Sequence, residues 1–344
     1  MASGVTLTRR GVLCTPAILL LACNQQPNVI EFSGTTMGTT YNVVAVDHSS
    51  TASAIEAHAE VETSLRAVNG SMSNWDPSSE ISLINAAQTT EAIPVSADLA
   101  EVLAAARSIN AASDGRFDVT VGPLIEAWGF GAGDTSPHML TDAEIKAAMA
   151  DVGQSQMLTV TQNTVRKARP GVEIYLAAIA KGFGVDQCAA ALHALGYRDY
   201  MVEIGGDLFT AGKNPDGIDW RIGVEQPTPG LGGVAEVVQV SGKGMATSGD
   251  YRNFFEDEGR RFSHIIDPAT GRPITHRTVS ATVFADSAML ADGWATAMLV
   301  LGAERGTVVA EEQGLAVMFI ERTESDNEHK FRTSGTSALA ELQV

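Results

Sequence analysis

Positive charge is scarce in this chain of 344 residues. It has 23 Lys and Arg against 41 Asp and Glu, a formal net charge of −18. Binding to nucleic acid requires a basic surface that neutralises phosphates, so the composition excludes that class of protein. Any anionic ligand must instead be held by a local device: a metal ion, a helix N-terminus or a few Lys and Arg side chains.

Cysteine is also rare, with three residues in the whole chain. Cys14 lies in the N-terminal leader and Cys23 is the expected lipid anchor, which leaves Cys188 alone in an Ala-rich helical pattern. A single thiol cannot form an intrachain disulfide, so we expect Cys188 to be a small core residue. The hydrophobic content of 44% is enough to bury a large core, either as one domain or as two closely joined ones.

The N-terminal apolar run, residues 11–22, is too short to span a membrane as a mature helix. It follows Arg9 and Arg10 and ends in Leu-Leu-Ala before Cys23, which resembles a bacterial lipobox; residues 8–13 also resemble a twin-arginine signal. We predict a signal peptide at 1–22 and a lipid-anchored tether at 23–30, with the protein on the extracytoplasmic (periplasmic) face of a membrane. The alternative is an ordinary secretory signal with a chance cysteine.

Residues 31–344 show helical and strand patterns in alternation. Helices are expected at 54–68, at 99–109 with Ser96 as cap, and after the capping box of Thr141 and Glu144. Strands are expected at 157–160, 173–176, 200–204, 220–224, 234–240, 278–284 and 315–320. Several strands are spaced as hairpins, which predicts an α+β fold with a mostly antiparallel sheet flanked by helices.

Residues 286–302 form the most informative segment, because they predict a helix that is apolar on nearly every face. Asp292 and Thr296 lie one turn apart on it, so a carboxylate and a hydroxyl share one face. An unpaired buried carboxylate is costly, and Mg²⁺ accepts both kinds of oxygen. The structural alternative is an Asp stabilised by the helix dipole and a Thr bonded to a backbone carbonyl.

Three further segments carry candidate chemistry. Residues 178–186 predict a Gly-containing helix entry that binds an anion with help from Lys181, or else a plain entry with a solvated Lys. Gly205 and Gly206 end a strand, either to let a ligand approach or as a simple hairpin turn. His264 precedes a turn and is either an acid/base at neutral pH or structural.

Taken together, the motifs resemble those of one family. They occur in the order 34–39, 72–75, 117–124 with 128–130, 179–182, 205–207, 247–252, 264–271 and 291–296. This ordered set resembles the ApbE-type FAD:protein FMN transferases over about residues 30–320. The resemblance implies an ApbE-like fold for residues 31–344.

The resemblance also implies an activity. Such enzymes bind FAD with Mg²⁺ and transfer the FMN half to a Ser or Thr hydroxyl of a membrane redox protein, releasing AMP. The expected partners are therefore FAD, an acceptor subunit of a membrane redox complex and the membrane itself, through the lipid anchor. In attack on a pyrophosphate, a metal ion neutralises charge and orients the leaving group.

The resemblance assigns roles to individual residues. The metal ligands would be the side chains of Asp292 and Thr296 with backbone oxygens of Ala178 and Ala295, and His264 would be the acid/base. The residues expected to bind FAD are Met37, Trp75, Arg116, Phe117, Asp118, Tyr175, Lys181 and Ile266.

One position departs from the family pattern. The family usually has Asp where this chain has Tyr175, followed by Ser or Gly where it has Ala177. Two alternatives therefore stay open: a flavin-binding lipoprotein that is an FAD carrier or inactive paralogue, and an FAD pyrophosphatase that produces FMN and AMP. Asp292, Thr296 and His264 favour an enzyme, since a carrier needs no metal at the pyrophosphate, whereas Tyr175 favours the carrier.

The lipobox predicts the outcome of Cys23→Ser. Because serine cannot be lipidated through a thioether, the variant should appear in the soluble fraction or as an uncleaved precursor, measured by membrane fractionation and immunoblotting. A variant that still fractionates as a mature lipoprotein would contradict the lipobox.

Overall fold

The computed structural model describes residues 28–48, 52–131, 136–227, 233–251, 253–257, 259–323 and 331–342. Cys23 and the expected signal peptide lie outside these residues. Strand β1 begins at Asn28, so residues 28–30 belong to the sheet and not to the tether that we expected to end at residue 30. No helix in the described part of the chain is both long and apolar enough to cross a membrane.

The centre of the fold is an eight-stranded sheet in which every neighbouring pair is antiparallel. This confirms the predicted α+β class with an antiparallel sheet. The strand order is β1 (Asn28–Thr36), β2 (Thr39–Asp47), β6 (Asp199–Ile204), β7 (Asp207–Ala211), β10 (Lys243–Gly249), β15 (Thr278–Ala285), β16 (Ala316–Arg322) and β17 (Phe331–Gly335).

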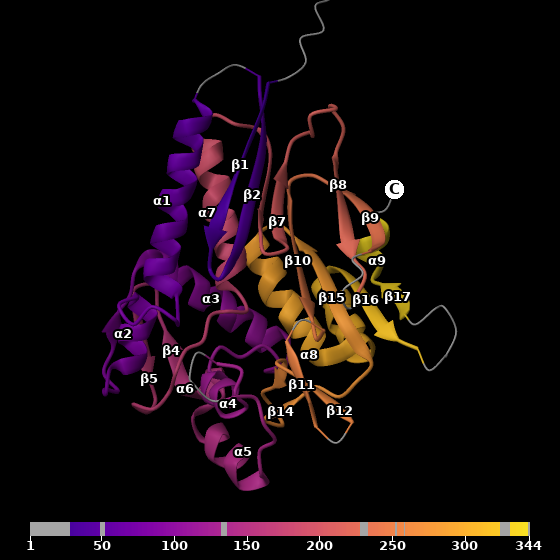
Figure 1. Ribbon diagram of the computed structural model, residues 1–344. Coiled ribbons are helices and arrows are strands. Elements are labelled where there is room, and N and C mark those ends of the chain that lie inside the picture. The colour runs from indigo at the N-terminus through magenta and orange to yellow at the C-terminus, as the bar shows by residue number, and fades with distance from the viewer. Residues whose placement is uncertain are drawn as a thin grey trace, which may run out of the picture.

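Long helices cover one face of this sheet (Figure 1). They are α1 (Ala54–Met72), α3 (Ala97–Ala112), α7 (Ala180–Ala194) and α8 (Ala288–Gln313). Helices α1 and α7 pack together beside β6, and α8 packs on β10 and β15. The alternation of β15 explains this placement, because Val279, Ala281 and Val283 are buried, and Phe284 joins the cluster on the opposite face.

The opposite face of the sheet is covered by the hairpin of β8 (Trp220–Glu225) and β9 (Val234–Val240). The remaining elements are short: α2 (Glu80–Ala86), β3 (Ile93–Pro94), α4 (Gly122–Ala127), α5 (Asp142–Ala148), the 3₁₀ turn Met149–Asp151, α6 (Gln154–Met157), β4 (Leu158–Val160), β5 (Thr164–Lys167), β11 (Phe254–Asp257), β12 (Arg260–Ser263), β13 (Ile266–Asp267), β14 (Arg272–Pro273) and α9 (Ser337–Ala340). Most of them gather at the lower end of the molecule in Figure 1.

Local sequence signals account for several boundaries. The Ser96 hydroxyl accepts a hydrogen bond from the backbone N–H of Leu99 and caps α3, and Thr141 forms the predicted capping box with Glu144. Cys188 is fully buried within α7, which confirms its expected place in the core.

The predicted end of one helix and one predicted strand are wrong. Helix α1 continues past Asn69 to Met72, because the Asn69 amide donates to the Leu65 carbonyl and to the Thr36 hydroxyl instead of ending the helix. Residues 173–176 do not form a strand. Their backbone bonds are made by amide side chains: Asn74 and Asn85 both donate to the carbonyl of Ile174, and their own oxygens accept from the chain there.

Helices α7 and α8 cross at very short range near Gly182. A Cβ atom at Gly182 would lie 2.2 Å from the Ala288 carbonyl oxygen and 2.8 Å from the Cβ of Asp292. Non-bonded heavy atoms do not approach this closely, so the two helices can cross here only if residue 182 is glycine. The N–H of Gly182 donates to the Asp292 carboxylate at 2.9 Å, which fastens the two helices at this point.

We predict that Gly182→Ala lowers the free energy of unfolding by about 1–3 kcal/mol, because the added methyl meets backbone that cannot move aside. Urea denaturation followed by circular dichroism measures this change. Gly70→Ala in α1 is the matched control, since a Cβ there meets nothing within 4 Å. It should be neutral or stabilise the protein by up to about 1 kcal/mol through helix propensity. Equal effects of the two substitutions would contradict the packing argument.

Candidate active site

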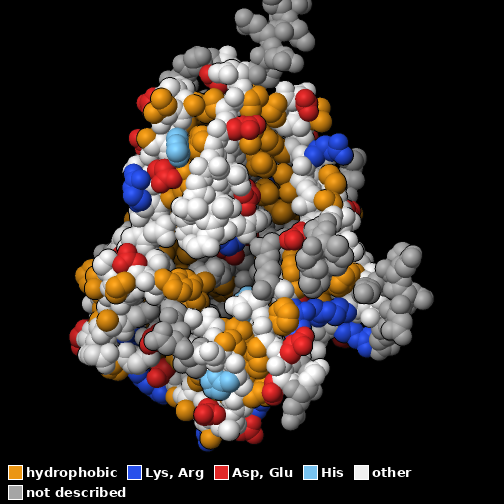
Figure 2. All heavy atoms as spheres, in the orientation of Figure 1, with side chains coloured by type: hydrophobic (Ala, Val, Ile, Leu, Met, Phe, Trp, Pro, Cys, Tyr) orange, Lys and Arg blue, Asp and Glu red, His pale blue; other side chains and the backbone are white. Residues whose placement is uncertain are grey.

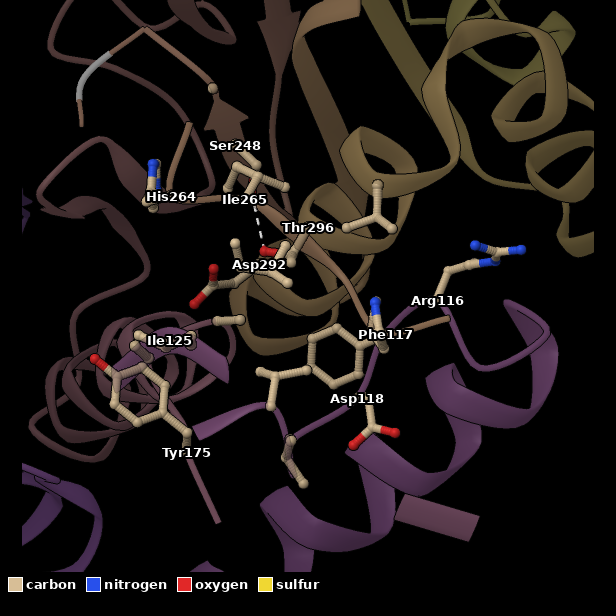
Figure 3. A pocket seen from close by; sticks show the side chains of 18 of the residues that line it. Arg116, Phe117, Asp118, Ile125, Tyr175, Ser248, His264, Ile265, Asp292 and Thr296 are labelled. Carbon is tan, nitrogen blue, oxygen red and sulfur yellow. Dashed lines mark hydrogen bonds between the residues drawn. The ribbon is translucent and has the colours of Figure 1, made fainter. Parts of the chain in front are cut away.

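A cavity opens where α8, the end of β10, the segment before α7 and the turn after β12 meet (Figure 3). The space-filling view shows the middle of this face to be hollowed (Figure 2). A second cavity lies beside it, against α1 and the start of α7. Ala177 lines both, so the two cavities adjoin across one residue. The arrangement suits an elongated ligand with two distinct ends.

Asp292 and Thr296 both face the first cavity from α8, as their spacing predicted. Burial and the neighbouring Asp207 raise the pKa of Asp292 to about 7, although Lys181 and the N–H of Gly182 act in the opposite sense. The Thr296 hydroxyl lies 3.1 Å from the hydroxyl of Ser248 on β10. A carboxylate and two hydroxyls therefore border one end of the cavity, visible at the centre of Figure 3.

Lys181 and Asp207 form an ion pair beside this group. The turn at Gly205 and Gly206, whose φ values are +56° and +99°, starts β7 so that the buried Asp207 carboxylate faces the entry of α7. Gly205 and Gly206 form the two-residue turn of the β6–β7 hairpin, which confirms the hairpin alternative. The alternative of a solvated Lys181 is wrong, because Lys181 is paired with Asp207. Lys181 lines the second cavity, so its charge lies on the boundary between the two.

His264 borders the first cavity from the turn between β12 and β13. Its Nδ1 lies 2.9 Å from the carbonyl oxygen of Asn253. Because a carbonyl oxygen only accepts, Nδ1 carries the proton of the neutral ring and Nε2 keeps a lone pair. Burial lowers the pKa of His264 below the ordinary histidine value, so the neutral ring prevails at pH 7.

Two predicted FAD-binding residues, Arg116 and Asp118, line the first cavity while their charged groups bond to other residues of the chain. Arg116 donates to both carboxylate oxygens of Asp267, each at 2.6 Å. The Asp118 carboxylate accepts from Thr120 and from the backbone N–H of Gln154, and so holds its own loop together. In Figure 3 both charged groups are turned away from Asp292.

The apolar wall of the first cavity includes two other predicted residues. Phe117 is almost fully buried and presents its ring, and Ile266 lies at the start of β13. Neighbouring apolar side chains that sequence reasoning missed complete the wall, namely Val121, Ile125, Ile265, Pro268 and Val300. They come from distant segments with no shared periodicity, so no sequence signal grouped them.

Aromatic rings mark the boundary toward the second cavity. Tyr175 lines the first cavity and Trp75 the second, and their ring centroids lie 5.6 Å apart at 63°. Trp75 is 58% exposed, which leaves a face available for a planar ligand ring. Burial and the charge of Glu126 raise the pKa of Tyr175 to about 12, so its hydroxyl stays protonated. Met37, in the turn between β1 and β2, also borders the second cavity.

The donor set can be tested against Mg²⁺. The described residues contain no group of three or more His, Cys, Asp or Glu that would hold a metal by themselves. Mg²⁺ typically takes one or two carboxylates and completes its octahedron with neutral oxygens, waters and substrate phosphates. Asp292, Thr296 and Ser248 supply one carboxylate and two hydroxyls, which fit this pattern.

The two predicted backbone ligands differ in position. Ala178 lines the first cavity, as do Asp292 and Thr296. Ala295 is fully buried in α8 and is not part of the cavity lining. Ser248 is a donor that sequence reasoning missed, because its proximity to Thr296 arises only when β10 packs on α8.

Comparison with known proteins agrees with this geometry. A sequence model of the ApbE family matches residues 37–319. The FAD:protein FMN transferase of Haemophilus influenzae is 43% identical over 332 residues, 95% of each chain. That of Vibrio cholerae is 41% identical over 317 residues, 92% of this chain and 95% of the relative. The solved structure of the flavin transferase ApbE from Vibrio cholerae matches with a TM-score of 0.84 at 39% identity, covering 92% of this chain and 99% of that one.

The chain therefore belongs to the ApbE family, which confirms the resemblance found in the sequence. It is an enzyme of that family, of the FAD:protein FMN transferase class. The flavin carrier that the sequence left open is thereby set aside.

The partly buried His264, whose pKa is lowered, predicts a pH dependence of stability. Its folded pKa is lowered, so below about pH 6.5 the unfolded chain binds more protons at this residue than the folded one does. Stability from His264 should be present at pH 7 and be lost as the pH falls toward its folded pKa. His264→Gln keeps a donor and cannot titrate, so its deficit in unfolding free energy relative to the wild type should shrink between pH 7 and pH 5 in urea titrations. A deficit independent of pH would contradict the burial argument.

Proposed function

We propose that this enzyme transfers the FMN moiety of FAD, in a Mg²⁺-dependent reaction, to a Ser or Thr hydroxyl of a membrane redox acceptor and releases AMP. The proposal rests on one observation: a carboxylate and two hydroxyls of the kind that bind Mg²⁺ border the same cavity as a neutral histidine whose Nε2 keeps its lone pair. The adjoining cavity, with Trp75 and Lys181, gives the rest of a dinucleotide a place to bind.

Mg²⁺, when bound, would neutralise phosphate charge and favour the leaving group. Asp292, Thr296 and Ser248, with the carbonyl of Ala178, are the groups of this chain that would hold it. Lys181 adds a positive charge next to them. The pairing of Lys181 with Asp207 keeps the ammonium group in place as the anionic substrate enters.

His264 has the properties of the base in this reaction. Its Nε2 can take the proton of the acceptor hydroxyl, while the bond from Nδ1 to Asn253 fixes the ring orientation. The hydroxyl oxygen forms a new bond to the FMN phosphorus. The P–O bond to the bridging oxygen breaks, and AMP leaves with that oxygen.

An FAD pyrophosphatase would use the same groups with water as the nucleophile. The two activities differ in one product only: FMN joined to protein or FMN set free. The relatives matched by this chain are FAD:protein FMN transferases, which favours a protein hydroxyl as the nucleophile.

We also propose that the domain works at the extracytoplasmic membrane surface, anchored through a lipidated Cys23. Four residues lie between Cys23 and Asn28, where β1 begins. An anchor this short would hold the cavity within reach of a membrane-bound acceptor.

The decisive experiment is incubation of the mature protein with FAD, Mg²⁺ and candidate acceptor domains. A fluorescent flavin band on the acceptor in a denaturing gel, together with AMP detected by chromatography, supports transfer. FMN and AMP in solution without a labelled acceptor would instead establish the pyrophosphatase. If FAD is not consumed, the protein has neither the transferase nor the pyrophosphatase activity.

Asp292→Asn should abolish most transfer while the protein stays folded. The amide oxygen of Asn can still accept from Gly182, but the side chain loses the charge that binds a cation. Labelling rate against Mg²⁺ concentration measures the change, with circular dichroism to verify the fold. Glu311→Gln, at the far end of α8, is the matched control and should label normally. Full activity of Asp292→Asn at unchanged Mg²⁺ dependence would rule out the metal assignment.

A further inference from the structure

Helices α7 and α8 cap each other. Helix α7 has no capping side chain of its own, and the N–H of Gly182 in its first turn donates to Asp292 of α8. In return, the Asp186 carboxylate of α7 accepts from the first two N–H groups of α8, those of Ala288 and Met289, at 2.8 and 2.9 Å. Each helix start is thus held by a carboxylate from the other helix.

This exchange bears directly on Asp292. The bond from Gly182 goes to Oδ2, and no hydrogen bond within the described residues reaches Oδ1. The side chain lies in the cavity lining, so Oδ1 is the oxygen available to a cation. Its position depends on where α8 begins relative to α7, which Asp186 sets.

We propose that Asp186 is a positioning residue for the metal site: it fixes the start of α8 so that Asp292 can bind Gly182 and a divalent cation together. The inference rests on the proposed function, since it takes Asp292 to be a metal ligand. Removing a residue that holds a metal ligand in position, without itself touching the metal, typically lowers metal affinity by about 10- to 100-fold.

Thr141 provides a matched control, because it caps a helix away from this crossing. Its hydroxyl accepts from the N–H of Glu144 in the first turn of α5. Ser287 cannot serve, since its side chain caps α8 through Leu290 and also bonds to the Asp186 carboxylate of α7. Thr141→Ala and Asp186→Asn both remove capping interactions, and only Asp186→Asn weakens the link between α7 and α8.

The test uses Mn²⁺ as the probe, with the electron paramagnetic resonance signal of the free ion reporting binding to the mature protein. Asp186→Asn should raise the Kd for Mn²⁺ by about tenfold, and Thr141→Ala should leave it unchanged while lowering the Tm. In the transfer assay, Asp186→Asn should raise the Mg²⁺ concentration needed for half-maximal rate, and saturating Mg²⁺ should restore the rate.

Asp186→Glu separates position from charge, and it also serves if Asp186→Asn does not fold. It keeps the carboxylate but lengthens the side chain by one methylene, so it should also weaken Mn²⁺ binding. Wild-type affinity in Asp186→Asn would reduce Asp186 to a simple cap, and wild-type affinity in Asp186→Glu would show that only its charge matters; either result overturns the inference. A wild-type protein that binds no Mn²⁺ overturns the metal site itself, and the inference with it.

Discussion

The crossing of α7 and α8 is the constraint on which the rest of the structure depends. Two helix starts and several acidic groups meet where only the hydrogen atom of Gly182 fits between the backbones. A carboxylate buried in an apolar helix would ordinarily be costly. Here the N–H of Gly182 on the opposite helix offsets part of that cost for Asp292. The Asp292 side chain also borders the cavity, where its other oxygen can meet a polar ligand. The sheet supports this crossing, because α8 packs on β10 and β15.

Charge distribution follows from the same arrangement. Asp186, Asp207 and Asp292 lie near one another with Lys181 as the compensating cation, and their mutual repulsion contributes to the raised pKa of Asp292. A divalent cation would relieve this repulsion. In the proposed reaction, the strongly acidic chain would bind an anionic dinucleotide through a local group of acids, because these acids would hold the metal ion that meets the phosphates. No basic surface is required.

The sequence was most informative where chemistry and periodicity lie in one segment. Asp292 and Thr296 share a helix face, and the capping residues Ser96 and Thr141 act on their own neighbours, so these features could be predicted. The rest depends on partners far apart in the chain. Arg116 is predicted to bind FAD and does line the first cavity, but its ion pair with Asp267, 151 residues away, could not be predicted. Residues 173–176 have strand-like composition, but amides from α2 and the turn after α1 take the bonds that a neighbouring strand would have made.

The double use of Asp292 has a consequence for evolution within the family. A descendant that lost transfer would still need this aspartate to cap α7, so selection for folding alone would retain it. Its presence in a relative is therefore weak evidence that the relative is active. The hydroxyls of Thr296 and Ser248 have no comparable role in folding, since within the described residues each bonds only to the other. Substitutions should therefore accumulate at these two positions first after activity is lost. The identity of these residues would distinguish active from inactive family members better than Asp292 does.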